Sequence, residues 1–336
     1  MSLFDIPKSE SETFVQKIFG RRCYCRHFIY ARHRMFSVVP AVEFYGPAMQ
    51  FVFAAVAILF VVFAVFGYAI GHMVAQNRRI AELRALEDAR REKDLAMART
   101  IQTSALPAVF PPFPDETRLD LFACMDTAKE VGGDFYDIYR LDHDHVALLM
   151  ADVSGKGIPA AMFMMRAKAL LKSCTTAIPD LAAAVTEANA RIDEGNDAMM
   201  FVTAWTCVIN LKTGEAVFVN AGHNPPFLRR ADGSMNCLRD RHGLVLAAAD
   251  IAKYRSGEIL LKKDDTLFLY TDGVTEAASP LGELFGEDRL ERVLGGMSGS
   301  AQGVCESVVK AVDAYADGAP QADDITVFTL RYLGEG

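Results

Sequence analysis

The stretch Leu148-Leu-Met-Ala-Asp-Val-Ser-Gly-Lys-Gly157 decides the fold of this 336-residue chain. Its apolar run, from Val146 to Ala151, is typical of a strand buried on both faces. The strand ends at Asp152, and a turn with two glycines follows before a helix predicted over 158–174. Burying a carboxylate is costly unless something binds it. We therefore expect a divalent cation at Asp152.

A hairpin is predicted between this strand and the strand before it. The motif Val131-Gly-Gly-Asp-Phe-Tyr-Asp137 opens the earlier strand, and Asp142-His-Asp144 supplies a polar turn. If the turn is centred on His143, the numbers of opposed residues add up to 286, as 134 and 152 do. The carboxylates of Asp134 and Asp152 would then face each other with Cβ atoms about 5 Å apart. A dication between them turns their repulsion into attraction, whereas a slip by one residue would separate them.

Charge divides the chain into distinct parts. The formal net charge is −8, yet residues 1–46 and 76–104 are net basic and residues 47–75 carry no Lys, Arg, Asp or Glu. Residues 105–336 carry 21 basic against 34 acidic side chains. This acidic half argues against nucleic acid as a partner, because binding it requires a basic patch. Seven cysteines without a repeated spacing do not form a disulfide framework, which indicates a reducing compartment for most of the chain.

Residues 47–75 are predicted to form a transmembrane helix. From Phe51 to Ile70 the only ionisable side chain is Tyr68, and these twenty residues span roughly 30 Å as a helix, the thickness of the bilayer hydrocarbon. Six Lys or Arg lie in residues 76–95 and two in residues 27–46. The positive-inside rule therefore places the C-terminal part in the cytoplasm.

The segments on either side of this helix give weaker signals. Residues 1–46 are basic and aromatic without a clear period, and we interpret them as a poorly ordered tail, with a segment lying on the membrane surface as the alternative. Residues 76–106 favour a helical linker. Because three positions of its heptad seam are charged, a solvated spacer and a parallel dimer stalk stay equal alternatives.

From residue 107 to residue 336 the pattern predicts one α+β domain. Hairpin-linked strands with helices in separate blocks indicate antiparallel sheets flanked by helices, not a doubly wound parallel fold. The expected strands are Leu119–Met125, Asp134–Leu141, His145–Val153, Phe201–Asn210, Ala216–Asn220, Pro226–Arg230, Thr266–Tyr270 and Ile325–Tyr332. The expected helices are Ile158–Cys174, Leu181–Asp193, Glu287–Leu294 and Ala301–Ala316.

Two further acidic motifs extend the set that Asp134 and Asp152 begin. An apolar strand ends at Asp272, and Asp323 and Asp324 stand at the start of the last strand. Each motif alone is an ordinary turn. Four acidic strand ends in one domain, without a Cys/His cluster, favour hard cations such as Mg²⁺ or Mn²⁺. Such a site can hold two ions that activate a water molecule and neutralise a phosphate.

Five motifs, taken in order, resemble the bacterial SpoIIE/RsbU-type branch of the metal-dependent PPM (type 2C-like) serine/threonine phosphatases. The resemblance covers about residues 105–333, and the segment from Ala98 to Gln102 is similar to the linker that precedes this domain in the family. The motifs are Gly132-Gly-Asp-Phe-Tyr-Asp137, Ala151-Asp-Val-Ser-Gly-Lys-Gly157, Asn220-Ala-Gly-His-Asn-Pro225, Tyr270-Thr-Asp-Gly273 and Asp323-Asp-Ile-Thr326.

The resemblance implies an α-β-β-α sandwich with two divalent cations, Mn²⁺ or Mg²⁺, at one end. A hydroxide that bridges the two metals attacks the phosphorus in line, so no nucleophilic side chain is required. The implied substrate is phosphoserine or phosphothreonine on an anti-sigma-factor antagonist of the STAS type, in signal transduction. The implied metal ligands are Asp134, Asp152 as the bridging ligand, the carbonyl of Val153, Asp272, Asp323 and, less firmly, Asp324. The implied catalytic residues, which act through the metal-bound water, are Asp134, Asp152, Asp272 and Asp323.

Two departures from the family pattern affect the rest of the site. Type 2C relatives carry a histidine, a proposed general acid, where this chain has Ser154. No arginine matches the one that grips phosphate in those relatives. Lys129 and Lys156 are candidates for substrate binding, with solvated surface lysines as the alternative. His223 is expected to order a turn.

Two other functional classes were weighed. Gly132-Gly-Asp-Phe135 approaches the diguanylate cyclase motif, but Phe135 stands where that motif has an acid. A catalytically decayed, membrane-anchored phosphoprotein-binding scaffold is the alternative to the phosphatase. The predicted organisation is a basic segment (1–46), a transmembrane helix (47–75), a helical linker that could pair two copies (76–106) and a PPM-type domain (107–336) on the cytoplasmic side of the bacterial inner membrane.

Overall fold

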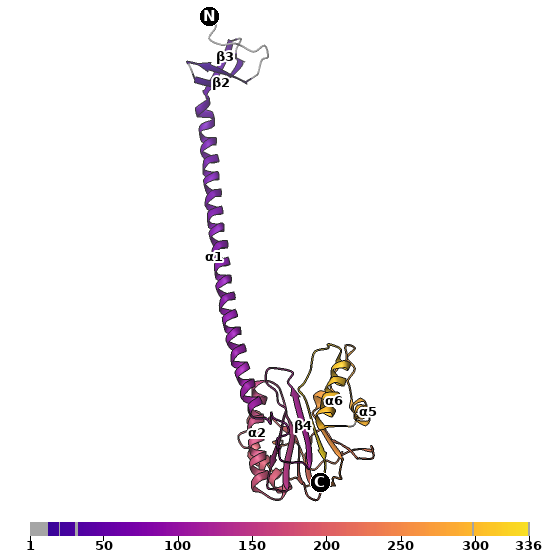
Figure 1. Cartoon of the computed structure of the whole chain (residues 1–336). Coiled ribbons are helices and arrows are strands. Elements are labelled where there is room, and N and C mark those ends of the chain that lie inside the picture. Colours follow the sequence, from indigo (N-terminus) through magenta and orange to yellow (C-terminus); the bar gives the residue numbers. More distant parts are fainter. Residues whose placement is uncertain (1–12, 20, 31–32, 298, 335–336) are drawn as a thin grey trace. The chain divides into compact units, whose positions relative to one another are not determined.

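The computed structural model describes residues 13–19, 21–30, 33–297 and 299–334 (Figure 1). The chain separates into two compact units, Met1–Ala89 and Arg90–Gly336. Helix α1 (Ala41–Ser104) contributes to both units. It contains the predicted transmembrane helix and most of the predicted linker, and it ends before Pro107 as expected.

The N-terminal unit begins with a three-stranded antiparallel sheet. Its strands are β1 (Thr13–Ile18), β2 (Arg21–Tyr30) and β3 (His33–Pro40), with β2 in the centre. The interpretation of this segment as a poorly ordered tail is therefore wrong for the strands, while residues 1–12 lie outside the described part. Cys23 and Cys25 are buried and Arg22 and Arg26 are exposed, which is the alternation of a strand. The mixture of basic and apolar residues hid this period of two.

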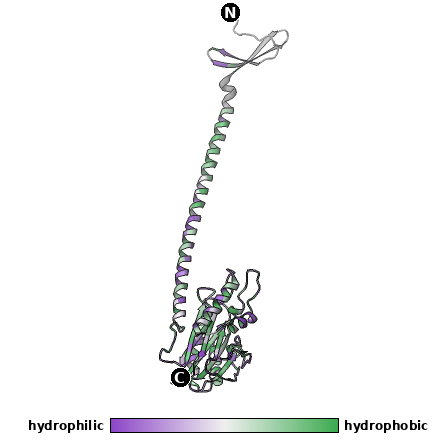
Figure 2. Cartoon of the chain, turned by 45° about the vertical axis from the view of Figure 1, so that its right-hand side comes forward, coloured by the Kyte–Doolittle hydropathy of each residue, from purple (hydrophilic) through white to green (hydrophobic). Residues whose placement is uncertain are grey.

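Helix α1 is long and apolar enough to cross a membrane, judged by its length and composition over Ala48–Ser104. Figure 2 shows apolar residues in the part nearer the N-terminus and polar residues toward its C-terminal end. Phe51, Phe60 and Phe66 are each more than 60% exposed within the chain itself, so no described part of the protein covers this stretch. Such an exposed apolar surface is typical of a helix that spans a membrane.

The C-terminal unit contains two five-stranded antiparallel sheets, which confirms the predicted α+β class. The first sheet has the order β11 (Gly257–Leu260), β8 (Glu215–Ala221), β7 (Val202–Asn210), β6 (His145–Val153) and β5 (Phe135–Arg140). The second sheet has the order β10 (Met235–Cys237), β9 (Phe227–Arg229), β12 (Thr266–Tyr270), β13 (Ile325–Tyr332) and β4 (Leu119–Asp126).

Helices cover the outer faces of both sheets, so the unit is an α-β-β-α sandwich (Figure 1). Helix α2 (Ile158–Ala177) packs on β5 and β6, and α3 (Leu181–Asp193) packs on β8. On the other side, α6 (Ala301–Ala316) packs on β4 and β13, and α5 (Glu287–Gly295) contacts α6. Asp180 caps α3 as expected, since its side chain accepts a hydrogen bond from the Ala183 amide.

The two cores follow from this layering. One core lies between the sheets and includes Leu148, Trp205 and Phe328. A second core lies between the second sheet and helices α5 and α6 and includes Phe268 and Val308. Strands β6 and β13 are buried on nearly their whole length because each has a neighbouring strand on either side and a covering layer on both faces, which explains why both strands were predictable from the sequence.

Candidate active site

The predicted register of the first hairpin is confirmed. Strands β5 and β6 pair with Phe135 opposite Ala151 and Arg140 opposite Val146, so opposed residue numbers add up to 286. Asp134 directly precedes β5, and Asp152 lies on β6 one residue beyond the last pair. The same register therefore brings these two carboxylates to the same end of the hairpin.

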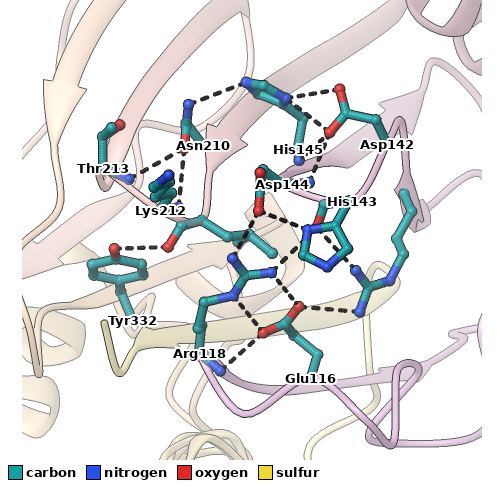
Figure 3. Close-up of polar contacts among 12 residues, drawn as sticks. Glu116, Arg118, Asp142, His143, Asp144, His145, Asn210, Lys212, Thr213 and Tyr332 are labelled. Carbon is teal, nitrogen blue, oxygen red and sulfur yellow. Dashed lines mark hydrogen bonds and ion pairs between the residues drawn. The ribbon is translucent and has the colours of Figure 1, made fainter. Parts of the chain in front are cut away.

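The turn at the other end of this hairpin is held by its own side chains (Figure 3). The Oδ1 atom of Asp142 accepts hydrogen bonds from the backbone amides of Asp144 and His145, both at 2.8 Å. The imidazole of His145 contacts the same carboxylate at 2.9 Å and Asn210 at 3.2 Å. These contacts fix the turn and leave little freedom for the register to slip.

A partly buried ion pair just before β4 supports the same turn. Arg118 donates from Nη1 to Oδ1 of Asp144 at 3.0 Å and from Nη2 to the carbonyl of His143 at 3.2 Å. Its Nε atom donates to Glu116 at 2.8 Å (Figure 3). The hydrogen bond from Arg118 lowers the pKa of Glu116 to about 2, although burial acts in the opposite direction. The pair therefore stays charged over the physiological range.

Asp134 is a buried carboxylate without a basic partner among the residues that the structure describes. It is 1% exposed, and its Oδ2 atom accepts hydrogen bonds from the hydroxyls of Thr271, at 2.7 Å, and Thr326. Burial, and then the negative charge of Asp152, raise the pKa of Asp134 well above its usual value. Two hydroxyl donors orient this side chain but do not neutralise it.

Carboxylates of the second sheet meet this pair. Burial, and next the charge of Asp272, raise the pKa of Asp152 to about 7, with a smaller contribution from Asp323. Asp272 is the first residue of the single-turn helix α4 (Asp272–Thr275), and its pKa is raised by burial and then by Glu276 and Asp323. We call Asp134, Asp152, Asp272 and Asp323 the acidic site. The site lies where both sheets end.

Lys156 enters the acidic site from the glycine turn after β6. Its Nζ atom lies 2.7 Å from Oδ2 of Asp323 and also donates to the carbonyl of Ala322. Gly155 and Gly157 have φ angles of 89° and 80°, which only glycine adopts readily, and they shape this turn. Lys129, the other lysine predicted to bind substrate, is exposed. The two lysines therefore differ: one is engaged by a carboxylate, and the other faces solvent.

The carboxylate of Asp324 holds the backbone around Gly132 and Gly133, which we call the glycine pair. Its Oδ1 atom accepts from the amide of Ala128 at 2.9 Å, and its Oδ2 atom accepts from the amide of Gly133 at 2.8 Å. A Cβ added at Gly132 would lie 2.0 Å from Oδ2 of Asp324, so only glycine fits there. Both oxygens of Asp324 thus have a structural role, which fits its weaker claim as a metal ligand.

The carbonyl of Val153 faces the glycine pair beside Asp152. A Cβ added at Gly133 would lie 2.7 Å from the Val153 oxygen and 3.3 Å from Oδ1 of Asp152. The absence of a side chain at Gly133 therefore leaves room next to these two oxygens. A carbonyl and a carboxylate that share a small open space are the kind of donors that Mg²⁺, Mn²⁺ and Ca²⁺ take.

The donor chemistry of the acidic site fits hard divalent cations, because every candidate ligand is an oxygen. Among the described residues, no three His, Cys, Asp and Glu side chains are arranged to hold one ion as they stand. Lys156 already pairs with Asp323. The ligand assignment therefore stays a prediction.

Sequence reasoning missed three residues that shape this site. Gln102 is 3% exposed; its Nε2 atom donates to the carbonyl of Gly132 at 2.7 Å, and its Oε1 atom accepts from the amide of Gly132 at 3.2 Å. The similarity of the segment ending at Gln102 to a family linker was the available signal. Thr271 and Thr326, which bind Asp134, sit beside the acidic residues of motifs that were read for their carboxylates alone.

Ser154 and His223 both have structural partners. The Oγ atom of Ser154 accepts from the amide of Phe201 at 2.9 Å. The backbone amide of His223 donates to Oδ1 of Asn220 at 2.8 Å. The Nδ1 atom of the His223 ring lies 2.9 Å from the hydroxyl of Thr203, and Thr203 is paired with Asp152 in the ladder of β6 and β7. Burial lowers the pKa of His223 to about 3, so the ring is neutral at pH 7. The side chain of Asn220, which bonds both backbone groups of His223, holds this turn, whereas the imidazole of His223 contacts Thr203.

Comparisons with known proteins agree with this architecture. Protein IcfG of Synechocystis sp. is 28% identical over 264 residues, which cover 70% of this chain and 41% of that protein. Phosphoserine phosphatase RsbU of Bacillus subtilis is 29% identical over 218 residues, which cover 65% of this chain and 64% of that protein. This chain therefore spans less than two thirds of either relative.

The fold and the family follow from two further matches. The SiaA-PP2C domain of Pseudomonas aeruginosa has a TM-score of 0.65 at 24% identity, covering 73% of this chain and 98% of that domain. The family model of stage II sporulation protein E (SpoIIE) matches residues 142–333, which is more than half of the chain. With two sheets and an acidic site in the predicted places, this chain belongs to the SpoIIE family.

Proposed function

We propose that this protein is a metal-dependent serine/threonine phosphatase that acts on a cytoplasmic regulatory phosphoprotein. The observation that carries the proposal is the meeting of carboxylates from both sheets in the acidic site, where burial and mutual repulsion raise their pKa values. This arrangement is unfavourable without cations and suits them well. The name of the relative RsbU, a phosphoserine phosphatase, supports the same reaction class.

The residues of the acidic site have distinct proposed roles. Asp134, Asp152, Asp272, Asp323 and the carbonyl of Val153 would hold two divalent cations, Mn²⁺ or Mg²⁺. When bound, these ions supply an activated water molecule and neutralise the charge of the phosphate. Thr271 and Thr326 fix the orientation of Asp134 through Oδ2. Asp324 keeps the glycine pair close to the site.

Phosphate recognition is assigned to the two lysines near the site. Lys156 lies beside Asp323 and has a flexible stem between two glycines, so its ammonium can reach a bound phosphate as well as the carboxylate. Lys129 follows Ala128, whose amide binds Asp324, and is exposed. Ser154 Oγ accepts a hydrogen bond from the Phe201 amide, and the proposal gives this hydroxyl no role as a proton donor.

The proposed substrate is an anti-sigma-factor antagonist of the STAS type, phosphorylated on serine or threonine. Similarity to RsbU supports this class of regulatory partner. The net acidic composition of residues 105–336 does not favour nucleic acid. A phosphoprotein that accumulates in a deletion strain, and that the purified protein dephosphorylates, would identify the substrate.

We place the protein in the bacterial inner membrane with a single crossing and the C-terminal domain in the cytoplasm. The length and apolar composition of α1 and the six against two basic residues at its flanks support this orientation. The same proposal divides the chain into segments that end at residues 46, 75 and 106, and it includes the pairing of the linker helices of two copies of the chain. Reporter fusions at residue 336 that are active outside the cell would contradict it.

The test of the activity uses the unit 90–336 and a phosphoserine peptide. We expect hydrolysis with Mn²⁺ or Mg²⁺ and none after exhaustive chelation, with recovery when metal is restored. Calorimetric titration of each metal gives a second readout. Full activity in chelator would contradict a metal-dependent mechanism. Tight binding of the phosphopeptide without hydrolysis in any metal would favour the decayed scaffold instead.

A further inference from the structure

A cavity of about 300 Å³ lies at the end of the second sheet that is remote from the acidic site. Thr266, the first residue of β12, lines this cavity, whereas Asp272 follows the last residue of the same strand. Six residues of extended chain separate them by roughly 20 Å. The cavity is therefore separate from the candidate active site, and its volume is at the lower end of the range for small-molecule sites.

Apolar side chains line two sides of the cavity. Phe227 of β9 and Phe268 of β12 are direct cross-strand neighbours and form its wall on the sheet side. Leu294 of α5 and Val304 of α6 line it from the helix layer, with Met297 between the two helices. A ligand here would contact apolar groups on both sides.

Two arginines, Thr266 and the carboxylate of Asp264 form the polar edge of the cavity. Arg229, Thr266 and Arg331 occupy one row across β9, β12 and β13, with Thr266 in the middle. Arg331 is already paired, since its Nη2 atom lies 2.6 Å from Asp264 and its Nη1 atom donates to the carbonyl of Gly299 at 3.3 Å. Its charge is therefore balanced within the protein.

Arg229 differs from Arg331 in having no such partner. Within the described ranges no carboxylate pairs with its guanidinium, and its Nε atom is buried without a hydrogen-bond acceptor. A buried donor that lacks an acceptor is unfavourable. The neighbouring Arg230 shows the usual solution, because it pairs with Asp265 at 2.6 Å. An anionic group in the cavity would give Arg229 the acceptor that it lacks.

We propose that this cavity binds a small amphipathic organic anion, with a carboxylate on Arg229 and an apolar body between Phe227, Phe268 and the helix layer. A carboxylate matches the planar fork of a guanidinium. A single unpaired arginine favours a monoanion. The volume equals that of about ten water molecules, so the ligand has on the order of ten to twelve non-hydrogen atoms. This inference does not depend on the proposed enzymatic activity.

The test uses the full chain in phosphatidylcholine nanodiscs and 4-phenylbutyrate as the probe, with empty nanodiscs as the blank. Calorimetry is expected to show saturable binding below about 5 mM. The neutral analogue 4-phenylbutyramide should bind about tenfold more weakly, because it cannot pair with Arg229. Arg229→Gln should weaken binding of the acid about tenfold and leave binding of the amide unchanged.

Two further variants complete the design. Met297→Asp adds a negative charge beside the cavity without altering the arginine row, and it should also weaken binding of the acid. Arg239→Gln removes an exposed arginine that pairs with Glu287 outside the cavity, and it should bind like the wild type. Equal affinity of the wild type for acid and amide, or an unchanged affinity of either Arg229→Gln or Met297→Asp for the acid, would overturn the proposal.

Discussion

The side-chain amide of Gln102 hydrogen-bonds both backbone groups of Gly132, donating to its carbonyl at 2.7 Å and accepting from its amide at 3.2 Å. This double contact joins the last turn of α1 to the turn that precedes Asp134. Because Gln102 is 3% exposed, water does not readily replace it. The geometry of the acidic site thus depends on a residue that lies outside the two sheets.

Gln102→Ala should lower the free energy of unfolding of the unit 90–336 by about 1–3 kcal/mol, since it leaves a buried amide and carbonyl without partners. Urea unfolding monitored by circular dichroism measures the change. Thr103→Ala is the matched control, because the exposed hydroxyl of Thr103 bonds only to carbonyls of its own helix. A Gln102→Ala variant as stable as the control would show that the double contact contributes little.

Asp134→Asn should stabilise the metal-free unit by about 1 kcal/mol while nearly abolishing turnover. The substitution removes one of two negative charges that repel each other. It keeps a side-chain oxygen that can accept hydrogen bonds from Thr271 and Thr326. The test is best made at pH 8, because the raised pKa of Asp134 favours its neutral form at lower pH. Thermal melts in chelator and in saturating Mn²⁺ compare the two proteins.

In Mn²⁺ the order of stability should change. Bound metal stabilises the wild type by about 2.7 kcal/mol at a concentration one hundred times its dissociation constant, so the wild type should melt at least as high as the variant. A lower melting temperature of Asp134→Asn in chelator would mean that the two carboxylates do not repel each other in the folded protein.

The domain should become less stable as the pH is lowered, because Glu116 then takes up a proton. The folded pKa of this group is lowered to about 2, below its usual value of 4.5, so its contribution is complete above pH 4.5 and is lost as the pH falls toward 2. Glu116→Gln should therefore be less stable than the wild type at pH 6, and the gap should narrow between pH 4.5 and pH 3. A gap that stays constant over this range would contradict the role of the Glu116–Arg118 pair.

Gly132→Ala should destabilise the domain by about 1–3 kcal/mol, because the new methyl group would overlap the carboxylate of Asp324. Gly295→Ala is the matched control: Gly295 is the last residue of α5, and an added Cβ there meets no atom within 4 Å. The control should be neutral or slightly stabilising, by up to about 1 kcal/mol. Equal melting temperatures of the two variants would refute the steric argument.

The fold was predictable where the sequence carries strong local signals. The register of β5 and β6 followed from a polar turn centred on His143, and the ends of β12 and β13 followed from apolar runs that stop at acidic residues. The short edge strands β10 and β11 were missed, since three or four residues carry too little periodicity. The N-terminal sheet was missed because two adjacent basic residues at 21–22 and three adjacent apolar residues at 28–30 interrupt the alternation along β2.

The site was less predictable than the fold, because it depends on contacts between distant segments. The acidic residues stood out in their motifs. The bond between Gln102 and Gly132 joins residues 30 positions apart, and the one between Thr326 and Asp134 joins residues 192 positions apart. No local pattern encodes such pairs. The hydrogen bonds from the backbone to Asp324 were equally unpredictable from the sequence, since a carboxylate beside a predicted ligand is interpreted as a second ligand.

With Asp323 as a proposed metal ligand, its ion pair with Lys156 would make metal loading an exchange instead of a simple addition. The protein's own ammonium group holds a ligand position in advance, so an arriving cation must displace it. The apparent affinity for that cation is then the difference between two interactions, and it is lower than the coordination alone would give. The displaced lysine is left without its counter-ion at the moment when the site becomes able to accept a phosphate.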